Sequence, residues 1–472
     1  MSELVDRFRR LTREQPDRPA IHVAHRTTTL ANRDLWQMQL DCQQLLTDAA
    51  LSSGDLIVVK SRNHPEWMAL LLAARALDIT MLAVDPGATR SEVEQLADRF
   101  GAAAIVSCVG DRITPVQIAP RHGPRRAYLG AAILKLTSGS SSAPRATFTT
   151  ESQLMADGEQ IIATMRIGIE DTQLAVIPLG HSYGLGVIAM PLLLQGTAII
   201  LRESFVPHQI ADDTGRFGAR RLPGVPFMFE HLLEHAPLRQ WPAGLHQVMS
   251  AGAPLLPAVG AAFHERFGIK IHAFYGTTET GGISYDESDD PLCQHTVGQP
   301  LSGVRISLQE EPDVPGGRIH AHSAAVSSGY VDVEDAQLRD GGFLTDDYGS
   351  FDPDGRLVLG GRISSFINVA GRKVQPSEVE SALRAHADIA DVRVTSAPDT
   401  LRGQHVAACI VRRAGSTLTM MAVRRFCSER LAPHKVPRVI VFAEGIPTTV
   451  RGKTDRDALQ ALIAGATASG GR

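Results

Sequence analysis

Short apolar runs and amphipathic stretches alternate along the first two thirds of the chain. Residues 55–60 (DLIVVK) and 79–84 (ITMLAV) are apolar runs bounded by turn-forming residues, and residues 65–76 between them follow a helical pattern. Further apolar runs, again separated by helical stretches, occupy residues 174–178, 198–201 and 246–249. This alternation predicts two α/β regions, each built on a mainly parallel sheet with flanking helices.

The pattern changes in the last third of the chain. Residues 297–359 contain short runs punctuated by Gly and Pro, which predicts a small antiparallel barrel or sandwich. Beyond them, predicted helices and strands alternate, with helices at residues 376–387 and 418–431 and strands at 392–395 and 405–411. We therefore predict a large N-terminal domain over residues 1–361 and a small α+β C-terminal domain over residues 362–472.

Composition and charge narrow the class of protein. With 43% hydrophobic residues, 21% charged residues and a net charge of -4, the chain has a globular profile and no overall attraction to nucleic acid or an anionic membrane. Its five cysteines are scattered, so neither a disulfide framework nor a zinc site is indicated. The charged N-terminus lacks the apolar core of a signal peptide, and Pro191, Gln195 and Gly196 interrupt the longest apolar stretch. We expect a cytoplasmic protein without a membrane span.

The most informative stretch is residues 134–147, LKLTSGSSSAPRAT. An apolar strand runs into a loop of small and hydroxyl residues that ends in a cation. Backbone N–H groups and hydroxyls of such a loop can surround phosphate oxygens, and Arg145 can add a bidentate contact. For this stretch alone, the alternative is a flexible Ser/Gly linker.

A second stretch, residues 274–282 (FYGTTETGG), combines an aromatic ring, hydroxyls and a carboxylate. The ring can stack on a base, a threonine can reach a phosphate, and Glu279 offers a hard oxygen ligand for a divalent cation. For this stretch alone, the alternative is a Gly-rich turn whose glutamate is merely solvated.

Two other stretches imitate known motifs. Gly452-Lys453-Thr454 resembles the end of a Walker A loop, but Pro447 stands where that motif needs its first glycine. A lone lysine in a turn is ordinarily a solvated charge. Residues 180–184 (GHSYG) match the nucleophile elbow of serine hydrolases, with Ser182 as the nucleophile. Because the chain has 17 histidines, some partner for Ser182 can always be nominated, and this match discriminates little.

The joint order of these motifs resembles the ANL superfamily of adenylate-forming enzymes, which includes acyl- and aryl-CoA synthetases, adenylation domains of peptide synthetases, and luciferases. The resemblance covers nearly the whole chain and includes three more stretches, GFLTDDYG at 342–349, GRISSFINVAGRKVQPSEVE at 361–380 and LAPHKVP at 431–437. It implies a large N-terminal domain of two α/β subdomains plus a distorted β-barrel, hinged near Arg362 to a small mobile C-terminal domain.

The resemblance implies a nucleotide site made of residues from both predicted domains. The residues that would hold the ATP phosphates are Thr137, Ser138, Gly139, Ser140, Ser141 and Arg145. The residues that would contact adenine and ribose are Gly252, Ala253, Tyr275, Gly276, Asp347 and Arg362.

The resemblance also implies roles in the reaction itself. Thr278 would touch the α-phosphate, and Glu279 would bind Mg2+. Lys453 matches the lysine that bridges the substrate carboxylate and the α-phosphate. His181 resembles the gate between the acyl pocket and the thiol tunnel, and the region of Gly371 resembles the loop that moves in for thioester formation.

The chain departs from the family pattern at three places. The family's glycine after the hydroxyl run is Ser142, its Lys-Gly is Arg145-Ala146, and its hinge Asp or Lys is Ser364. Arginine keeps the charge of lysine but not its compact geometry. These departures put the handling of phosphate and the details of domain rotation in doubt, but they leave Glu279 and Lys453 in place.

The function implied is that of an ATP-dependent ligase, which forms an acyl-AMP from a carboxylic acid and then an acyl thioester. ATP, Mg2+ and coenzyme A would be required, with carrier-protein phosphopantetheine as the alternative thiol. Ser182 stands where amino-acid-activating relatives place an aspartate, and residues 181–191 and 281–283 supply small and apolar residues to the expected acid pocket. We therefore rank fatty or other acyl acids first, aryl acids second and amino acids third.

Two alternatives lie outside this class. One is a serine hydrolase built on Ser182, and the other is a non-catalytic nucleotide-binding protein, suggested by the altered phosphate loop. The oligomeric state is open at this level.

Overall fold

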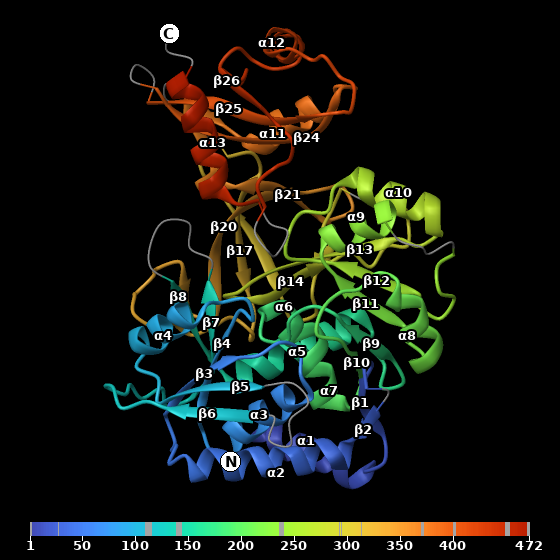
Figure 1. Cartoon of the computed structure of the whole chain (residues 1–472), viewed down its shortest axis with the longest axis vertical. Coiled ribbons are helices and arrows are strands. Elements are labelled where there is room, and N and C mark those ends of the chain that lie inside the picture. Colours follow the sequence, from blue (N-terminus) through green and yellow to red (C-terminus); the bar gives the residue numbers. More distant parts are fainter. Residues whose placement is uncertain are drawn as a thin grey trace. The chain divides into compact units, whose positions relative to one another are not determined.

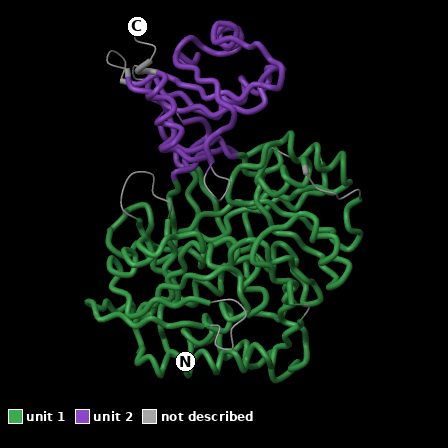
Figure 2. The backbone as a smooth tube through the Cα atoms, in the orientation of Figure 1, with its two compact units in different colours: residues 1–308, 319–345, 351–358 green, residues 309–318, 346–350, 359–472 purple. Residues whose placement is uncertain are grey.

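The structure, a computed structural model, divides into two compact units (Figure 2). It describes residues 2–26, 28–108, 116–137, 144–235, 240–291, 293, 295–312, 314–369, 372–399, 403–448 and 454–469. The first unit contains residues 1–308, 319–345 and 351–358, and the second contains residues 309–318, 346–350 and 359–472. The predicted mixed α/β fold, with a large N-terminal and a small C-terminal part, is confirmed.

The first α/β region of the larger unit is built on a seven-stranded sheet (Figure 1). Its strands, in spatial order, are β18 (Gly329–Tyr330), β8 (Arg145–Thr150), β7 (Ala131–Thr137), β4 (Thr80–Val84), β3 (Leu56–Lys60), β5 (Ala104–Cys108) and β6 (Val116–Pro120). The four central strands, β7, β4, β3 and β5, are parallel, as the alternation of apolar runs and helical stretches predicts.

The second α/β region is built on a nine-stranded sheet. Its strands, in spatial order, are β15 (Gln299–Pro300), β14 (Gly281–Tyr285), β13 (Ile271–Thr277), β12 (Gln247–Ser250), β11 (Arg221–Gly224), β9 (Thr172–Ala175), β10 (Ala198–Leu201), β1 (Pro19–Val23) and β2 (Thr28–Ala31). The three apolar runs predicted as strands in this region are β9, β10 and β12, within one to three residues at their ends.

Helices cover both sheets. They are α1 (Glu3–Glu14), α2 (Asn32–Asp48), α3 (Pro65–Ala76), α4 (Arg90–Arg99), α5 (Glu151–Met165), α6 (Ser182–Gly184), the π-helix η1 (Leu185–Ala189), α7 (Met190–Gln195), α8 (Gln209–Phe217), α9 (Pro226–His235) and α10 (Pro257–Phe267). Helix α3 begins with Pro65 in its first turn, where the missing N–H costs nothing. It is apolar around its circumference because it is buried on all sides.

One apolar core joins the inner faces of the two sheets through α3, α5 and α7. Ile57 and Val59 of β3 point into this core, whereas Leu56 and Val58 point into a second core against α4. Successive side chains of a strand alternate between its faces, so a strand covered on both sides has to be apolar throughout. This explains the uninterrupted apolar run of the sequence at β3.

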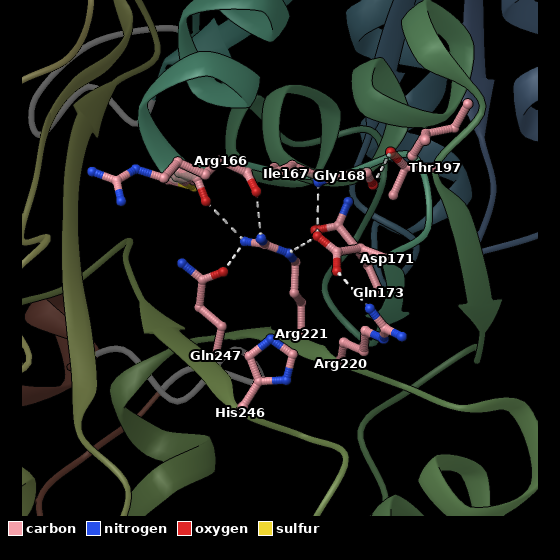
Figure 3. A network of polar contacts seen from close by, with 12 residues as sticks. Arg166, Ile167, Gly168, Asp171, Gln173, Thr197, Arg220, Arg221, His246 and Gln247 are labelled. Carbon is pink, nitrogen blue, oxygen red and sulfur yellow. Dashed lines mark hydrogen bonds and ion pairs between the residues drawn. The ribbon is translucent and has the colours of Figure 1, made fainter.

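Arg221, a buried residue of β11, ties the nine-stranded sheet to the loop that follows α5 (Figure 3). Its Nε donates to Asp171 Oδ2 over 2.6 Å, and its Nη2 donates to the carbonyl of Arg166 over 2.7 Å. Its Nη1 donates to the carbonyl of Met165 over 3.1 Å and to the side chain of Gln247 on β12. A buried charge needs such compensation, so this network fixes the loop on the sheet.

Residues 297–359, predicted as a small antiparallel barrel or sandwich, form most of a five-stranded sheet. Its spatial order is β16 (Arg305–Gln309), β17 (Gly317–His322), β20 (Gly342–Phe351) and β19 (Leu338–Arg339), with β21 (Leu357–Arg362) also paired to β20. A 3₁₀ turn, η2 (Ile363–Ser365), follows β21.

The C-terminal part has the predicted α+β composition. Its sheet has the order β23 (Arg372–Val374), β22 (Ile367–Val369), β25 (Gly403–Arg412) and β24 (Ile389–Asp399), with β26 (Val439–Ala443) paired to β25, and its helices are α11 (Pro376–Arg384), α12 (Met420–Ser428) and α13 (Arg456–Ser469). Both predicted helices and both predicted strands are present, with the helices shorter and the strands longer than expected. In the part of the chain that the structure describes, no helix has the length and apolarity needed to cross a membrane.

Candidate active site

Glu279 lies in a tight turn between the antiparallel strands β13 and β14. The hydroxyls of Thr277 and Thr280 accept each other's backbone N–H over 3.3 Å and lie 3.0 Å apart, which fixes the turn. The side chain of Glu279 is 8% exposed, and its backbone carbonyl accepts the N–H of Ser327 over 2.8 Å. The turn therefore presents a nearly buried carboxylate in a defined position beside the half-buried Thr278.

Tyr330 holds this carboxylate from the neighbouring sheet. Its hydroxyl donates to Glu279 Oε1 over 2.7 Å. Burial and the adjacent carboxylate both raise the pKa of Tyr330, so the hydroxyl keeps its proton and acts as a donor. Strand β18, which carries Tyr330, pairs with β8 next to the predicted phosphate loop. The structure thus joins the two sequence motifs through a tyrosine that belongs to neither.

Arg145 completes this group of side chains. Its guanidinium lies 3.6 Å from the centroid of the Tyr330 ring, and its Nη2 donates to Asp335 Oδ2 over 2.8 Å. A cation stacked on an aromatic face and paired with a carboxylate is held in place on two sides. The side chain predicted to bind phosphate thus also packs on the tyrosine that holds Glu279.

The residues predicted to contact adenine lie on or just after two adjacent strands. Strands β12 and β13 are parallel, with Ser250 beside Ala273. Gly252 and Ala253 follow β12 directly, while Tyr275 and Gly276 lie two to three residues past Ala273. Gly252 has a φ of 81°, which favours glycine because other residues adopt it at a cost. Carboxyl ends of parallel strands are the usual place for ligand binding in open α/β sheets.

The predicted ribose contacts, Asp347 on β20 and Arg362 at the end of β21, form an ion pair. Arg362 Nε donates to Asp347 Oδ1 over 3.0 Å, and the arginine side chain is 56% exposed. An exposed pair of this kind contributes only about 0–1 kcal/mol, so a ligand can displace it. Ser364, which stands at the family's hinge position, donates its backbone N–H and its hydroxyl to Asp346.

His181 precedes the short helix α6, and its Nε2 lies 3.7 Å from Asp85 Oδ2. The next residue, Ser182, has a buried Oγ without a hydrogen-bond partner among the residues that the structure describes. A serine nucleophile needs a base within hydrogen-bond reach. The geometry therefore does not support the serine hydrolase alternative. The π-helix η1 that follows is a rare conformation that is frequent at functional sites.

Several predicted site residues lie outside the described residues. They are Ser138, Gly139, Ser140, Ser141 and the neighbouring Ser142 of the phosphate loop, together with Gly371 and Lys453. Thr137 ends β7 immediately before this loop, and its hydroxyl donates to the carbonyl of Arg145 over 3.4 Å. The described part of the chain thus stops at residue 137, at the start of the loop, and continues at residue 144.

A divalent cation fits the donor set at Glu279. The described residues contain no cluster of three or more His, Cys, Asp or Glu side chains that could hold a metal alone. Mg2+ does not need such a cluster, because it commonly binds one or two carboxylates together with substrate phosphates. A single carboxylate next to the phosphate loop matches that pattern.

Sequence reasoning missed Tyr330, Asp335 and the buried Lys135. Lysine at position 135 interrupts the apolar run of β7 and is 7% exposed. Because lysine is almost never fully buried without a partner, its place in an apolar run was a usable signal. No comparable signal marked Tyr330, because its partner Glu279 lies 51 residues away in the sequence.

Sequence and structure comparisons identify the family and the fold of this chain. The AMP-binding enzyme family model matches residues 8–331, and the model of the AMP-binding enzyme C-terminal domain matches residues 378–453. Sulfoacetate--CoA ligase of Cupriavidus necator is 31% identical over 69% of this chain and 66% of its own length. Oxalate--CoA ligase of Arabidopsis thaliana is 25% identical over 93% of this chain and 95% of its own length. ATP-bound MatB from Rhodopseudomonas palustris has the same fold, with a TM-score of 0.85 at 22% identity over 98% of this chain and 99% of its own.

The family models and the fold define an adenylate-forming enzyme of two α/β regions with a smaller C-terminal part. The chain belongs to the AMP-binding enzyme family, whose models match most of its length. It is an AMP-forming acid–CoA ligase.

Proposed function

We propose that this ligase activates a carboxylic acid with an uncharged acyl or aryl tail, using ATP and Mg2+, and transfers the acyl group to coenzyme A. The observation that carries the proposal is the position of Glu279, a nearly buried carboxylate that the Tyr330 hydroxyl orients in the turn after β13, the strand that carries Tyr275. A metal-binding carboxylate, an adenine-binding wall and a phosphate loop in one region are what adenylation requires.

In the first step, a carboxylate oxygen of the acid attacks the α-phosphorus, and the bond from that phosphorus to pyrophosphate breaks. Both reactants are anions, so positive charge has to be supplied in the transition state. A magnesium ion bound at Glu279 would supply part of it by neutralising phosphate oxygens. Thr278 would contact the α-phosphate, and Lys453 would bridge the carboxylate and the α-phosphate.

In the second step, a thiolate attacks the carbonyl carbon of the acyl-AMP, and AMP leaves with the electron pair of the broken bond. The region of Gly371 and the gate residue His181 would act here. His181 is 41% exposed and lies 3.7 Å from Asp85, so a change in its side-chain position would not disturb the core. Coenzyme A is the proposed thiol, and a carrier-protein phosphopantetheine is the alternative that the acceptor assay distinguishes.

The test is acid-dependent ATP–pyrophosphate exchange with the wild type, Lys453→Ala and Arg456→Ala. Arg456 is an exposed residue at the start of α13 and provides a matched loss of one positive charge three residues away. Losing one preorganised donor at a reacting centre typically costs about 10²- to 10³-fold in rate. We expect the exchange rate of Lys453→Ala to fall by that factor. The exchange rate of Arg456→Ala should change by less than about twofold, as for most exposed positions.

The acid panel should contain straight-chain, aryl and amino acids, with sulfoacetate and oxalate because two relatives are named for them. Exchange confined to acids with uncharged tails supports the proposed substrate class, whereas exchange only with sulfoacetate, oxalate or amino acids would overturn it. ATP binding without exchange for every acid would favour a non-catalytic nucleotide-binding protein. The acceptor is tested by AMP formation. If AMP forms with coenzyme A and not with a carrier protein that bears phosphopantetheine, coenzyme A is the acceptor.

A further inference from the structure

The two stretches predicted to line the acid pocket, residues 181–191 and 281–283, meet at a buried carboxylate. Asp157 lies in the middle of α5 and is 6% exposed. Its Oδ1 accepts the backbone N–H of Gly282 over 2.8 Å. The carboxylate therefore holds the backbone of β14 where that strand would form one wall of the pocket.

Glycines on both walls leave room for this carboxylate. A Cβ at Gly281 would lie 2.2 Å from Asp157 Oδ1, and a Cβ at Gly186 would lie 2.6 Å from Asp157 Oδ2. Both distances are far below a van der Waals contact. Gly281 also has a φ of 70°, which only glycine adopts readily. The side chain of Asp157 thus occupies the space between the π-helix η1 and β14, and this space is not available to a ligand.

Lys135 is the counter-charge of Asp157. The ammonium on β7 and the carboxylate on α5 interact electrostatically, and both residues are buried. Burial raises the pKa of Asp157, and the positive charge of Lys135 opposes that rise. An apolar tail that pushed between these charges would have to separate them without offering a polar partner, which is costly in a buried environment.

We propose that Asp157 is a specificity-determining residue that closes the inner end of the acid pocket and restricts the ligase to short acids. This inference rests on the proposed function, because it takes residues 181–191 and 281–283 as the walls of the acid pocket. The carboxylate occupies the space that a longer hydrocarbon tail would need, and the backbone N–H of Gly282 holds it there. Long straight-chain acids are excluded, although the pocket walls are otherwise small and apolar.

The experiment compares straight-chain acids from acetate to octanoate in ATP–pyrophosphate exchange, with kcat and KM measured for each. Two double variants isolate the effect of volume. Asp157→Asn with Lys135→Met removes both charges and keeps the size of the side chain and an acceptor for Gly282. Asp157→Ala with Lys135→Met also removes both charges but opens the inner end of the pocket. Neither variant leaves Asp157 or Lys135 as a buried charge without the other, and Glu279, which also interacts with Lys135, keeps its hydrogen bond from Tyr330. A thermal melt checks that both variants fold.

We expect the wild type and the Asn-containing variant to prefer butanoate over octanoate in kcat/KM, and the Ala-containing variant to lose about tenfold of that preference through a lower KM for octanoate. The space released accommodates about two methylene groups, each worth close to a factor of four. Any general loss of adenylation caused by Lys135→Met affects all acids alike and cancels in this ratio.

If the wild type has the same kcat/KM for octanoate as for butanoate, the inference is overturned before any variant is measured. Equal length profiles in the two double variants would also overturn it and leave Asp157 a structural residue. Both outcomes require exchange to occur, so they differ from failure of the proposed function, in which no uncharged acid supports exchange and this inference falls as well.

Discussion

Replacing Tyr330 with phenylalanine tests whether the carboxylate of Glu279, the proposed Mg2+ ligand, is oriented in advance. The substitution removes only the hydroxyl that donates to Glu279 Oε1 over 2.7 Å. The ring remains, and with it the stacking of Arg145 at 3.6 Å from the ring centroid. The change therefore isolates one hydrogen bond in the group formed by Glu279, Tyr330 and Arg145.

The expected magnitude follows from two limits. A hydrogen bond to a charged group is worth about 1.5–3 kcal/mol net. Immobilising a glutamate side chain costs up to about 2 kcal/mol, and Glu279, at 8% exposure, is already restricted by its surroundings. The hydroxyl can bond the carboxylate both with and without the metal. Metal affinity therefore depends only on the part of the hydrogen-bond free energy that orients the carboxylate before the metal binds. We expect a loss of about 1–2 kcal/mol, or about 5- to 30-fold in the Mg2+ concentration for half-maximal exchange.

The assay is ATP–pyrophosphate exchange as a function of Mg2+ at saturating ATP and acid. Tyr128→Phe is the matched control, since it removes a buried tyrosine hydroxyl that donates over 2.8 Å to the carbonyl of Phe100 and not to Glu279. Glu279→Gln, which removes the charge of the proposed ligand, should raise the required Mg2+ concentration more than Tyr330→Phe does. The reasoning is refuted if folded Tyr330→Phe requires the same Mg2+ concentration as Tyr128→Phe.

Two further predictions concern stability. Arg221→Met should lower the free energy of unfolding by about 3 kcal/mol, because the buried Asp171 loses its close ion-pair partner and keeps only the longer contact with Arg220 at 3.9 Å. Urea denaturation should show almost no change for Arg90→Met, whose side chain is 92% exposed, and a similar midpoint for both variants would contradict the prediction. Burial lowers the pKa of His272 in the folded chain from its ordinary 6.5. As the pH falls, this histidine is therefore protonated at a higher pH in the unfolded chain than in the folded chain. Stability is then full above about pH 6.5 and falls as the pH drops toward the lower folded value. His272→Gln should flatten this acid-side slope in thermal melts, and an unchanged slope would exclude this histidine as its cause.

Much of the fold was predictable because its elements carry local signals. The apolar run of β3 reflects a strand buried on both faces, and Pro65 marks the start of α3 at the one position where its missing N–H is harmless. The small sheet around β20 was less predictable. Its short strands, such as β18 and β19 with two residues each, take their position from pairing partners distant in the sequence.

The candidate site divides in the same way. The sequence indicated Glu279 and Arg145 from their motifs, and their roles in the reaction stay predictions. It gave no indication that Tyr330 links them, because hydrogen bonding and stacking depend on the pairing of β18 with β8. Residue type and spacing within a motif carry local chemistry, whereas contacts between motifs exist only once the sheets are assembled.

The sequence by itself determined the class of this protein: the order of its motifs identified an adenylate-forming ligase, since each motif is a short local unit with its own chemistry. Only the tertiary structure decided what surrounds those motifs. It placed the carboxylate of Asp157 between Gly186 and Gly281, with Lys135 as its counter-charge. The physical reason is that burial, charge compensation and pocket depth are properties of packed elements, and residues far apart in the chain share them only after folding.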